Sequence, residues 1–212
     1  MVQLKAQDDL DRAVTILTAR CPDLARAHQV TGFPAIRQRS ADFEGLATIV
    51  VAQQVSTASA RSIWQRIKDE LGSVTPEAIM RRDDDALRTL GLSKPKVRTL
   101  RCAAQAAQSG EVDFGMLERL PSDDVHQCLT AVTGIGPWTA DIYLLFCLGR
   151  ADIWPAGDLA LMEAIRHLRD LDTVPEGDDR IRHADAWHPY RGAAALLLWA
   201  YYGAIKRPGT LA

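Results

Sequence analysis

Residues 129–140 read LTAVTGIGPWTA, two apolar segments that meet at Gly134-Ile135-Gly136. Apolar residues at helical spacing on both sides predict two helices, and glycines this close together predict a very tight turn between them. Glycine lets a backbone approach a ligand closely, and the first turn of the following helix offers unpaired N–H groups to an anion. A phosphate is the natural anion, although a Gly-x-Gly corner taken alone favours ordinary helix packing.

The rest of the chain is predicted to be helical. Glycine and proline divide it at intervals that fit helices. No segment shows the sustained alternation of apolar and polar residues that is typical of a surface strand. Ser122 is the expected N-cap of the helix that leads into the tight turn. We predict helices at residues 43–51, 56–71, 95–109, 122–132, 137–148, 159–168 and 193–202.

Composition places the chain among globular proteins. It has 212 residues, of which 47% are hydrophobic and 25% charged. No uncharged stretch, including the strongly apolar one at residues 192–205, reaches the roughly 20 residues that span a bilayer, and the first residues have no apolar signal segment. We therefore expect a cytoplasmic protein without a membrane partner.

Charge and cysteine usage narrow the binding chemistry. A net charge of −2 argues against bulk electrostatic attraction to nucleic acid, so any DNA contact is expected to be local. The cysteines have no close pair of the kind that zinc or iron–sulfur sites need, and we expect four buried, reduced thiols. They are Cys21, Cys102, Cys128 and Cys147.

Further stretches complete a family pattern. They are Gln53-Gln54-Val55-Ser56, residues 90–98 (LGLSKPKVR), Pro155-Ala156-Gly157-Asp158 and Trp187-His188-Pro189-Tyr190-Arg191. With the glycine turn, they resemble the helix–hairpin–helix (HhH-GPD) DNA glycosylase superfamily over residues 42–202. Within it the pattern is most similar to the 3-methyladenine DNA glycosylase II branch.

The resemblance implies an all-α fold of two helical lobes. One lobe, residues 42–150, would bear the helix–hairpin–helix motif, and the second would be built from residues 1–41 and 151–212. A cleft between the lobes would take a flipped base. The implied partner is double-stranded DNA containing alkylated bases, bound by a monomer that would associate with the nucleoid in a bacterial cell.

The implied activity is hydrolysis of the N-glycosidic bond of an alkylated base, which leaves an abasic site. Asp158 is the implied catalytic carboxylate, and without the resemblance it reads as a helix N-cap. Trp138 stands where lyase relatives carry a lysine nucleophile, which predicts a monofunctional enzyme. A non-catalytic damaged-DNA-binding protein and a glycosylase for another lesion class remain alternatives.

The resemblance also assigns the remaining site residues. The base pocket would be lined by Trp138 and Trp199, for which core packing is the alternative, and Tyr143 and Trp154 would add further walls; Ile142 and Ala200 replace pocket tyrosines of the family. Gln54 would be the wedge that fills the gap left by the flipped base. Phosphates would lie near Gly134, Gly136, Thr139 and Lys96. No redox or organic cofactor is implied, but a Na⁺ or K⁺ ion would sit on the backbone carbonyls of Thr130, Val132 and Ile135.

Overall fold

The computed structural model describes residues 2–206. Over this range it contains thirteen helices and no strand, with one isolated β-bridge between Gln3 and Arg150. The predicted all-α fold is confirmed. Within the same range, no helix combines the length and apolarity that a membrane span requires. The structure divides into two compact units, which are described separately below.

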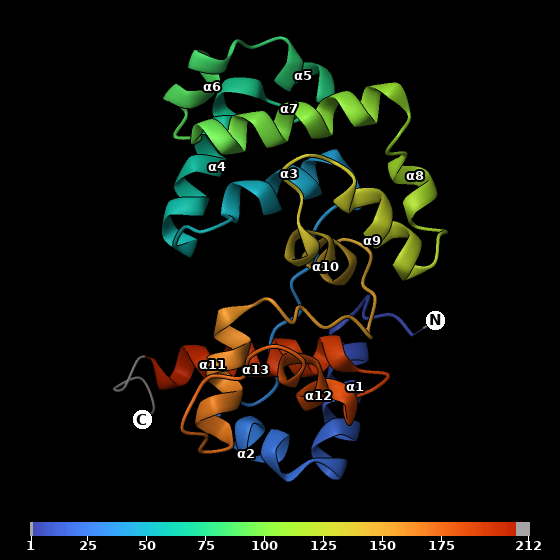
Figure 1. The fold of residues 1–212 in the computed structure, drawn as a ribbon, viewed down its shortest axis with the longest axis vertical. Coiled ribbons are helices and arrows are strands. Elements are labelled where there is room, and N and C mark those ends of the chain that lie inside the picture. Colours follow the sequence, from blue (N-terminus) through green and yellow to red (C-terminus); the bar gives the residue numbers. More distant parts are fainter. Residues whose placement is uncertain (1, 207–212) are drawn as a thin grey trace. The chain divides into compact units, whose positions relative to one another are not determined.

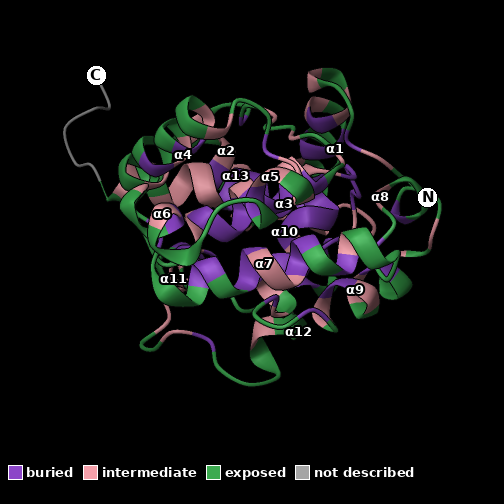
Figure 2. Ribbon diagram, turned by 90° about the horizontal axis from the view of Figure 1, so that it is seen from above, coloured by how far each residue is buried: buried purple, intermediate pink, exposed green. Residues whose placement is uncertain are grey.

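The first unit, residues 39–148, is called the hairpin lobe. Its helices are α3 (Phe43–Ala52), α4 (Thr57–Leu71), α5 (Pro76–Met80), α6 (Asp84–Thr89), α7 (Lys94–Ser109), α8 (Phe114–Leu117), α9 (Ser122–Thr130) and α10 (Pro137–Phe146). Helix α3 packs against α4, α7 and α10, and α9 packs against α10 (Figure 1). Figure 2 shows α3 and α10 as buried along most of their length, which explains their nearly uninterrupted apolar sequences.

Side-chain caps set where several of these helices begin. Asp42 accepts from Gly45 N at 2.9 Å to cap α3, and Ser56 accepts from Ser59 N at 3.1 Å to cap α4. Ser122, expected to cap α9, is instead its first helical residue, and Pro121 occupies the N-cap position. The prediction was wrong by one residue because proline favours the extended conformation that an N-cap needs.

The second unit, residues 2–38 and 149–206, is called the terminal lobe. Its helices are α1 (Gln7–Arg20), α2 (Pro22–Thr31), α11 (Leu159–Leu168), α12 (Asp179–Asp185) and α13 (Arg191–Ile205). Helix α13 packs against α1, α2 and α11, so the two ends of the chain share one core (Figure 1). Every residue from 192 to 198 is buried, and small side chains at 192–195 allow this close packing.

The cysteines differ from the expectation in one respect. All four are free thiols, but each is half-buried rather than fully buried. Cys102 and Cys128 lie within helices, and Cys21 and Cys147 lie at helix ends.

Candidate functional site

The glycine turn joins α9 to α10 as a closed hairpin. Ile135 N donates to Val132 O at 3.0 Å, and Gly134 has a φ of +89°, in the region that favours glycine. A Cβ placed on Gly134 would lie 1.9 Å from Thr99 Oγ1 on α7. The fold itself therefore requires glycine at position 134.

Gly136 is different, because nothing in the protein requires it. It is the N-cap of α10 with a φ of −95°, and a Cβ built there would meet no heavy atom within 4 Å. Pro137 fills the first helical position without an N–H, so the amides of the next residues form the positive end of α10. Open space beside such a helix start suits a closely approaching anion.

The predicted cation ligands lie at the same turn. Thr130 is the last residue of α9, and Val132 O already accepts the hydrogen bond from Ile135 N. A carbonyl oxygen has two lone pairs, so this contact leaves Val132 O able to hold a monovalent ion as well. The residues present thus fit the implied ion.

Gln54 lies on an exposed turn after α3. Its φ is +53°, a left-handed value that is uncommon for a residue other than glycine and typically costs about 1 kcal/mol or more. The preceding residue, Gln53, is the C-cap of α3, and its Nε2 donates to Thr139 Oγ1 on α10 at 2.8 Å. The structure thus presents Gln54 outward on a turn that is tied to the hairpin helix.

Two residues expected near phosphates face the interior instead. Lys96 is only 8% exposed, and its Nζ donates to Val51 O at 2.7 Å. Burial lowers the pKa of this ammonium, and the carbonyl at the negative end of α3 provides its partner. Thr139 is 2% exposed, with its hydroxyl engaged by Gln53. The polar groups of both side chains are therefore already engaged inside the hairpin lobe.

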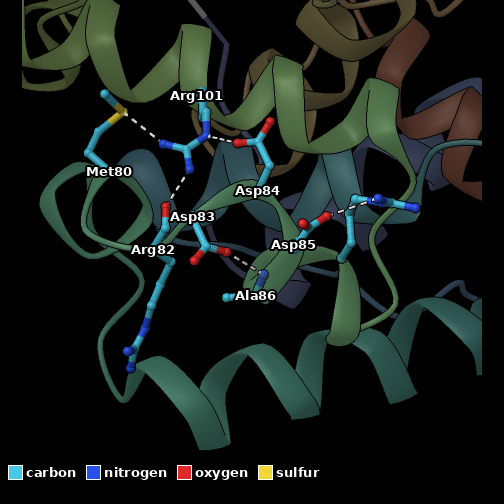
Figure 3. Close-up of polar contacts among 8 residues, drawn as sticks. Met80, Arg82, Asp83, Asp84, Asp85, Ala86 and Arg101 are labelled. Atoms are coloured by element: carbon cyan, nitrogen blue, oxygen red, sulfur yellow. Dashed lines mark hydrogen bonds and ion pairs between the residues drawn. The ribbon is translucent and has the colours of Figure 1, made fainter.

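Fewer basic side chains around Lys96 are free to contact DNA than the sequence indicates. Figure 3 shows the Arg101 guanidinium between the Asp84 carboxylate, the Arg82 carbonyl oxygen and the Met80 sulfur. The acidic run that supplies Asp84 begins with Asp83, which caps α6 through Ala86 N at 2.7 Å. The basic side chains of this stretch that remain exposed are Lys94 and Arg98.

The terminal lobe carries the candidate catalytic carboxylate. Asp158 is the N-cap of α11, and its Oδ1 accepts a hydrogen bond from Leu161 N at 3.0 Å. The same oxygen accepts a second hydrogen bond from Trp199 Nε1 on α13, also at 3.0 Å. Both side chains are half-buried. Two donors on one oxygen fix the orientation of the carboxylate.

The four aromatic residues expected in a base pocket fall into two groups. Trp138 and Trp199 are half-buried, near the start of α10 and on α13. Tyr143 is fully buried in the hairpin lobe. Trp154 is 8% exposed, packs edge-on against Trp187 with ring centroids 5.3 Å apart, and donates from Nε1 to Arg180 O at 2.7 Å. Tyr143 and Trp154 therefore have core positions, where apolar packing accounts for them.

Sequence reasoning missed several residues of these sites. Gln53 and Thr99 were not singled out, since a helix-end glutamine and a mid-helix threonine carry no signal of their own. Asp141 on α10 was missed too; burial raises its pKa to about 7, and His126 Nε2 lies 3.6 Å from its Oδ1. An acidic residue in an otherwise apolar helix was the available signal.

Part of the Trp187–Arg191 motif has a structural role. The Arg191 guanidinium donates two hydrogen bonds to the Asp152 carboxylate, Nε to Oδ1 at 2.9 Å and Nη2 to Oδ2 at 2.8 Å. His188 Nδ1 lies 2.7 Å from the same carboxylate. Burial alone would raise the pKa of Asp152, but the Arg191 contacts outweigh it and lower the pKa. This ion pair joins the start of α13 to the loop before α11.

Comparison with known protein families identifies the class to which this all-helical fold with a glycine hairpin belongs, which is a class of DNA repair proteins. The family model described as "HhH-GPD superfamily base excision DNA repair protein" matches residues 47–189. The chain belongs to this superfamily.

Individual relatives are similar over most of their length. DNA-3-methyladenine glycosylase 1 of Schizosaccharomyces pombe is 32% identical over 166 residues, which cover 76% of this chain and 73% of the relative. A solved structure of the 3-methyladenine DNA glycosylase of the same yeast, in complex with abasic DNA, has a TM-score of 0.80 at 30% identity, covering 89% of this chain and 95% of that one. The DNA-3-methyladenine glycosidase of Bacillus halodurans has a TM-score of 0.76 at 32% identity, with 92% and 90% covered.

Proposed function

We propose that the protein is a monofunctional DNA glycosylase of base excision repair that hydrolyses the N-glycosidic bond of alkylated bases of the 3-methyladenine type. The observation that carries this proposal is the Asp158 carboxylate, oriented by Leu161 N and Trp199 Nε1. Membership of the superfamily and the names of the similar proteins support the substrate class.

Asp158 acts on the sugar in this proposal. Breaking the glycosidic bond builds positive charge on the deoxyribose, and a fixed carboxylate beside C1′ stabilises that charge or orients the attacking water. Alkylation already makes the base a good leaving group, so the reaction needs no strong general acid. The hydrogen bonds to Oδ1 keep the carboxylate in place, which avoids reorganisation during the reaction.

DNA is held mainly through backbone atoms. The hairpin amides at Gly134, Gly136 and Trp138 bind a phosphate at the positive end of α10, and a Na⁺ or K⁺ ion on the hairpin carbonyls would add positive charge there. Gln54 is the proposed wedge. A flipped, cationic base is attracted to the face of a tryptophan by about 0.5–2 kcal/mol, the role proposed for Trp138 and Trp199.

The absence of lyase activity is part of the proposal. A lyase needs an amine nucleophile that forms a Schiff base with the sugar. Trp138 occupies the position of the resembled lysine, and its indole supplies no such amine. Borohydride should therefore trap no covalent adduct between the protein and alkylated DNA.

The deciding experiment measures bases released from methylated DNA by chromatography, for the wild type and for Asp158→Asn. Asparagine keeps the N-cap, so the variant should fold and bind DNA. We expect the wild type to release 3-methyladenine or 7-methylguanine and the variant to be slower by a factor on the order of 10³. DNA binding without release by the wild type would indicate a damage sensor or another lesion class instead.

A further inference from the structure

We propose that Lys96, Gln53 and Thr139 are positioning residues that hold Gln54 at a set place relative to the hairpin. Residues 53–56, which carry Gln54, are called the wedge turn. The proposal rests on the function proposed above, because it gives these residues the task of supporting the wedge. None of the three side chains needs to touch the DNA.

Lys96 supports the helix that ends in the wedge turn. It lies in the first turn of α7, and its Nζ donates to Val51 O, in the last turn of α3, at 2.7 Å. The last carbonyls of a helix have no partner within the helix and carry partial negative charge. A buried ammonium is costly unless it is hydrogen-bonded, so this contact strongly favours one position of the end of α3 relative to α7.

Gln53 ties the wedge turn to the hairpin helix. Its Nε2 donates to Thr139 Oγ1 at 2.8 Å, and Thr139 lies in the first turn of α10. The hydroxyl is buried, so the amide of Gln53 has little freedom to move away. Gln54, the next residue, is exposed and held at a φ of +53°. Strain of this kind persists where the surrounding contacts determine the backbone.

Helix α7 connects both supports to the hairpin itself. Thr99 lies one turn after Lys96, on the same face of α7, and its side chain fills the space beside Gly134. Lys96 therefore supports the wedge turn, and Thr99 supports the phosphate-binding turn, from one helix. This arrangement fixes the spacing between the place where the backbone is bound and the place where the wedge enters the duplex.

The proposal has a specific consequence for substrates. A wedge is needed to hold a base out of a duplex, whereas a base in single-stranded DNA is already unpaired. Weakening the support should therefore slow release from duplex DNA and leave release from single strands nearly unchanged. A general loss of folding would lower both rates together.

The test compares release of the same alkylated base from duplex and single-stranded DNA. Lys96→Met keeps the aliphatic stem and removes the ammonium, and Thr139→Val removes the hydroxyl at nearly equal volume. The second variant keeps the test valid if the first fails to fold, as judged by thermal unfolding. Lys68→Met is the matched control, since it removes a lysine whose Nζ binds Glu44 Oε1 at 2.8 Å in the same lobe.

We expect both positioning variants to release the base from duplex DNA about tenfold more slowly than the wild type, as Gln54→Ala should. Their rates of release from single-stranded DNA should stay within about twofold of the wild type. Lys68→Met should leave the ratio of the two rates unchanged. Equal losses on both substrates, or no loss in either variant while Gln54→Ala shows one, would overturn this inference alone. No release by the wild type from either substrate would overturn the proposed function, and this inference with it.

Discussion

The hairpin lobe and the terminal lobe offer different chemistry to a nucleic acid. The hairpin lobe presents backbone groups at a glycine turn, while its lysine and threonine candidates are buried. The terminal lobe presents a side chain, the Asp158 carboxylate, held by two donors. Backbone contacts to phosphate are insensitive to sequence, and a fixed carboxylate suits a reaction at one atom. In the proposed function, the hairpin lobe holds the DNA and the terminal lobe carries the group that reacts with it.

Changing the two hairpin glycines separately tests most directly whether the hairpin serves folding, DNA binding or both. Gly134→Ala should lower the free energy of unfolding by about 2–4 kcal/mol, because its Cβ meets Thr99 and its φ is left-handed. Thermal or denaturant unfolding measures this directly. A stable Gly134→Ala protein would contradict the packing of the hairpin against α7.

Gly136→Ala is the matched control, with the opposite expectation. Stability should stay within about 0.5 kcal/mol of the wild type, because the added methyl group meets open space. DNA affinity, measured by fluorescence anisotropy, should fall about tenfold if a phosphate approaches this position closely. Unchanged affinity would show that DNA does not use this space.

The hairpin lobe also contains a side chain that works against folding at neutral pH. Burial raises the pKa of Asp141 from its ordinary 3.8 to about 7. The folded form therefore holds this proton more tightly than the unfolded chain. The contribution of Asp141 to stability falls as the pH rises from about 4 to 7 and stays low above that range.

Asp141→Asn should remove this pH dependence. We expect a gain in unfolding free energy on the order of 2 kcal/mol at pH 8 and almost none at pH 4, where the native carboxyl is protonated. Urea unfolding at both pH values measures the difference. An equal change in unfolding free energy at the two pH values would show that packing, rather than ionisation, causes it. A lower unfolding free energy at pH 8 would show that the contact of Asp141 with His126 outweighs the cost of burial.

Trp199→Phe sharpens the role of the terminal lobe. The substitution keeps an aromatic ring and removes the N–H that binds Asp158 Oδ1. Base release should slow about tenfold, because a hydrogen bond to a charged group contributes about 1.5 kcal/mol. Trp64→Phe, in the hairpin lobe, is the control. A wild-type rate of base release in Trp199→Phe would show that the indole N–H is not needed and that only the aromatic ring of Trp199 contributes.

Arg101→Ala should have the smallest effect. Its ion pair with Asp84 lies at the surface, where such pairs contribute about 0–1 kcal/mol, and its charge is already engaged. DNA affinity should not change. Arg98→Ala, three residues earlier and exposed, is the comparison: if it contacts a phosphate, the slope of log affinity against log salt should become shallower by about 0.9.

Local sequence predicted the long helices of the hairpin lobe together with α11 and α13, because their signals are local, but it did not predict α1, α2, α6, α8 or α12. Helix α11 begins and ends where the apolar spacing and the Asp158 cap indicated, and α4 and α7 end at residues 71 and 109 as predicted, each followed by a glycine. The site was predicted less completely. Lys96 is part of a basic run in the sequence, yet its direction depends on where α3 ends in space.

By itself, the sequence determined the all-α fold, the glycine hairpin and the position of Asp158 at a helix start, since each follows from contacts among residues close in the chain. Tertiary structure alone decided which polar side chains turn inward: Lys96 to Val51, Gln53 to Thr139, and Trp199 to Asp158. The physical reason is that a buried donor or acceptor must find a partner, and that partner is chosen by packing between distant segments.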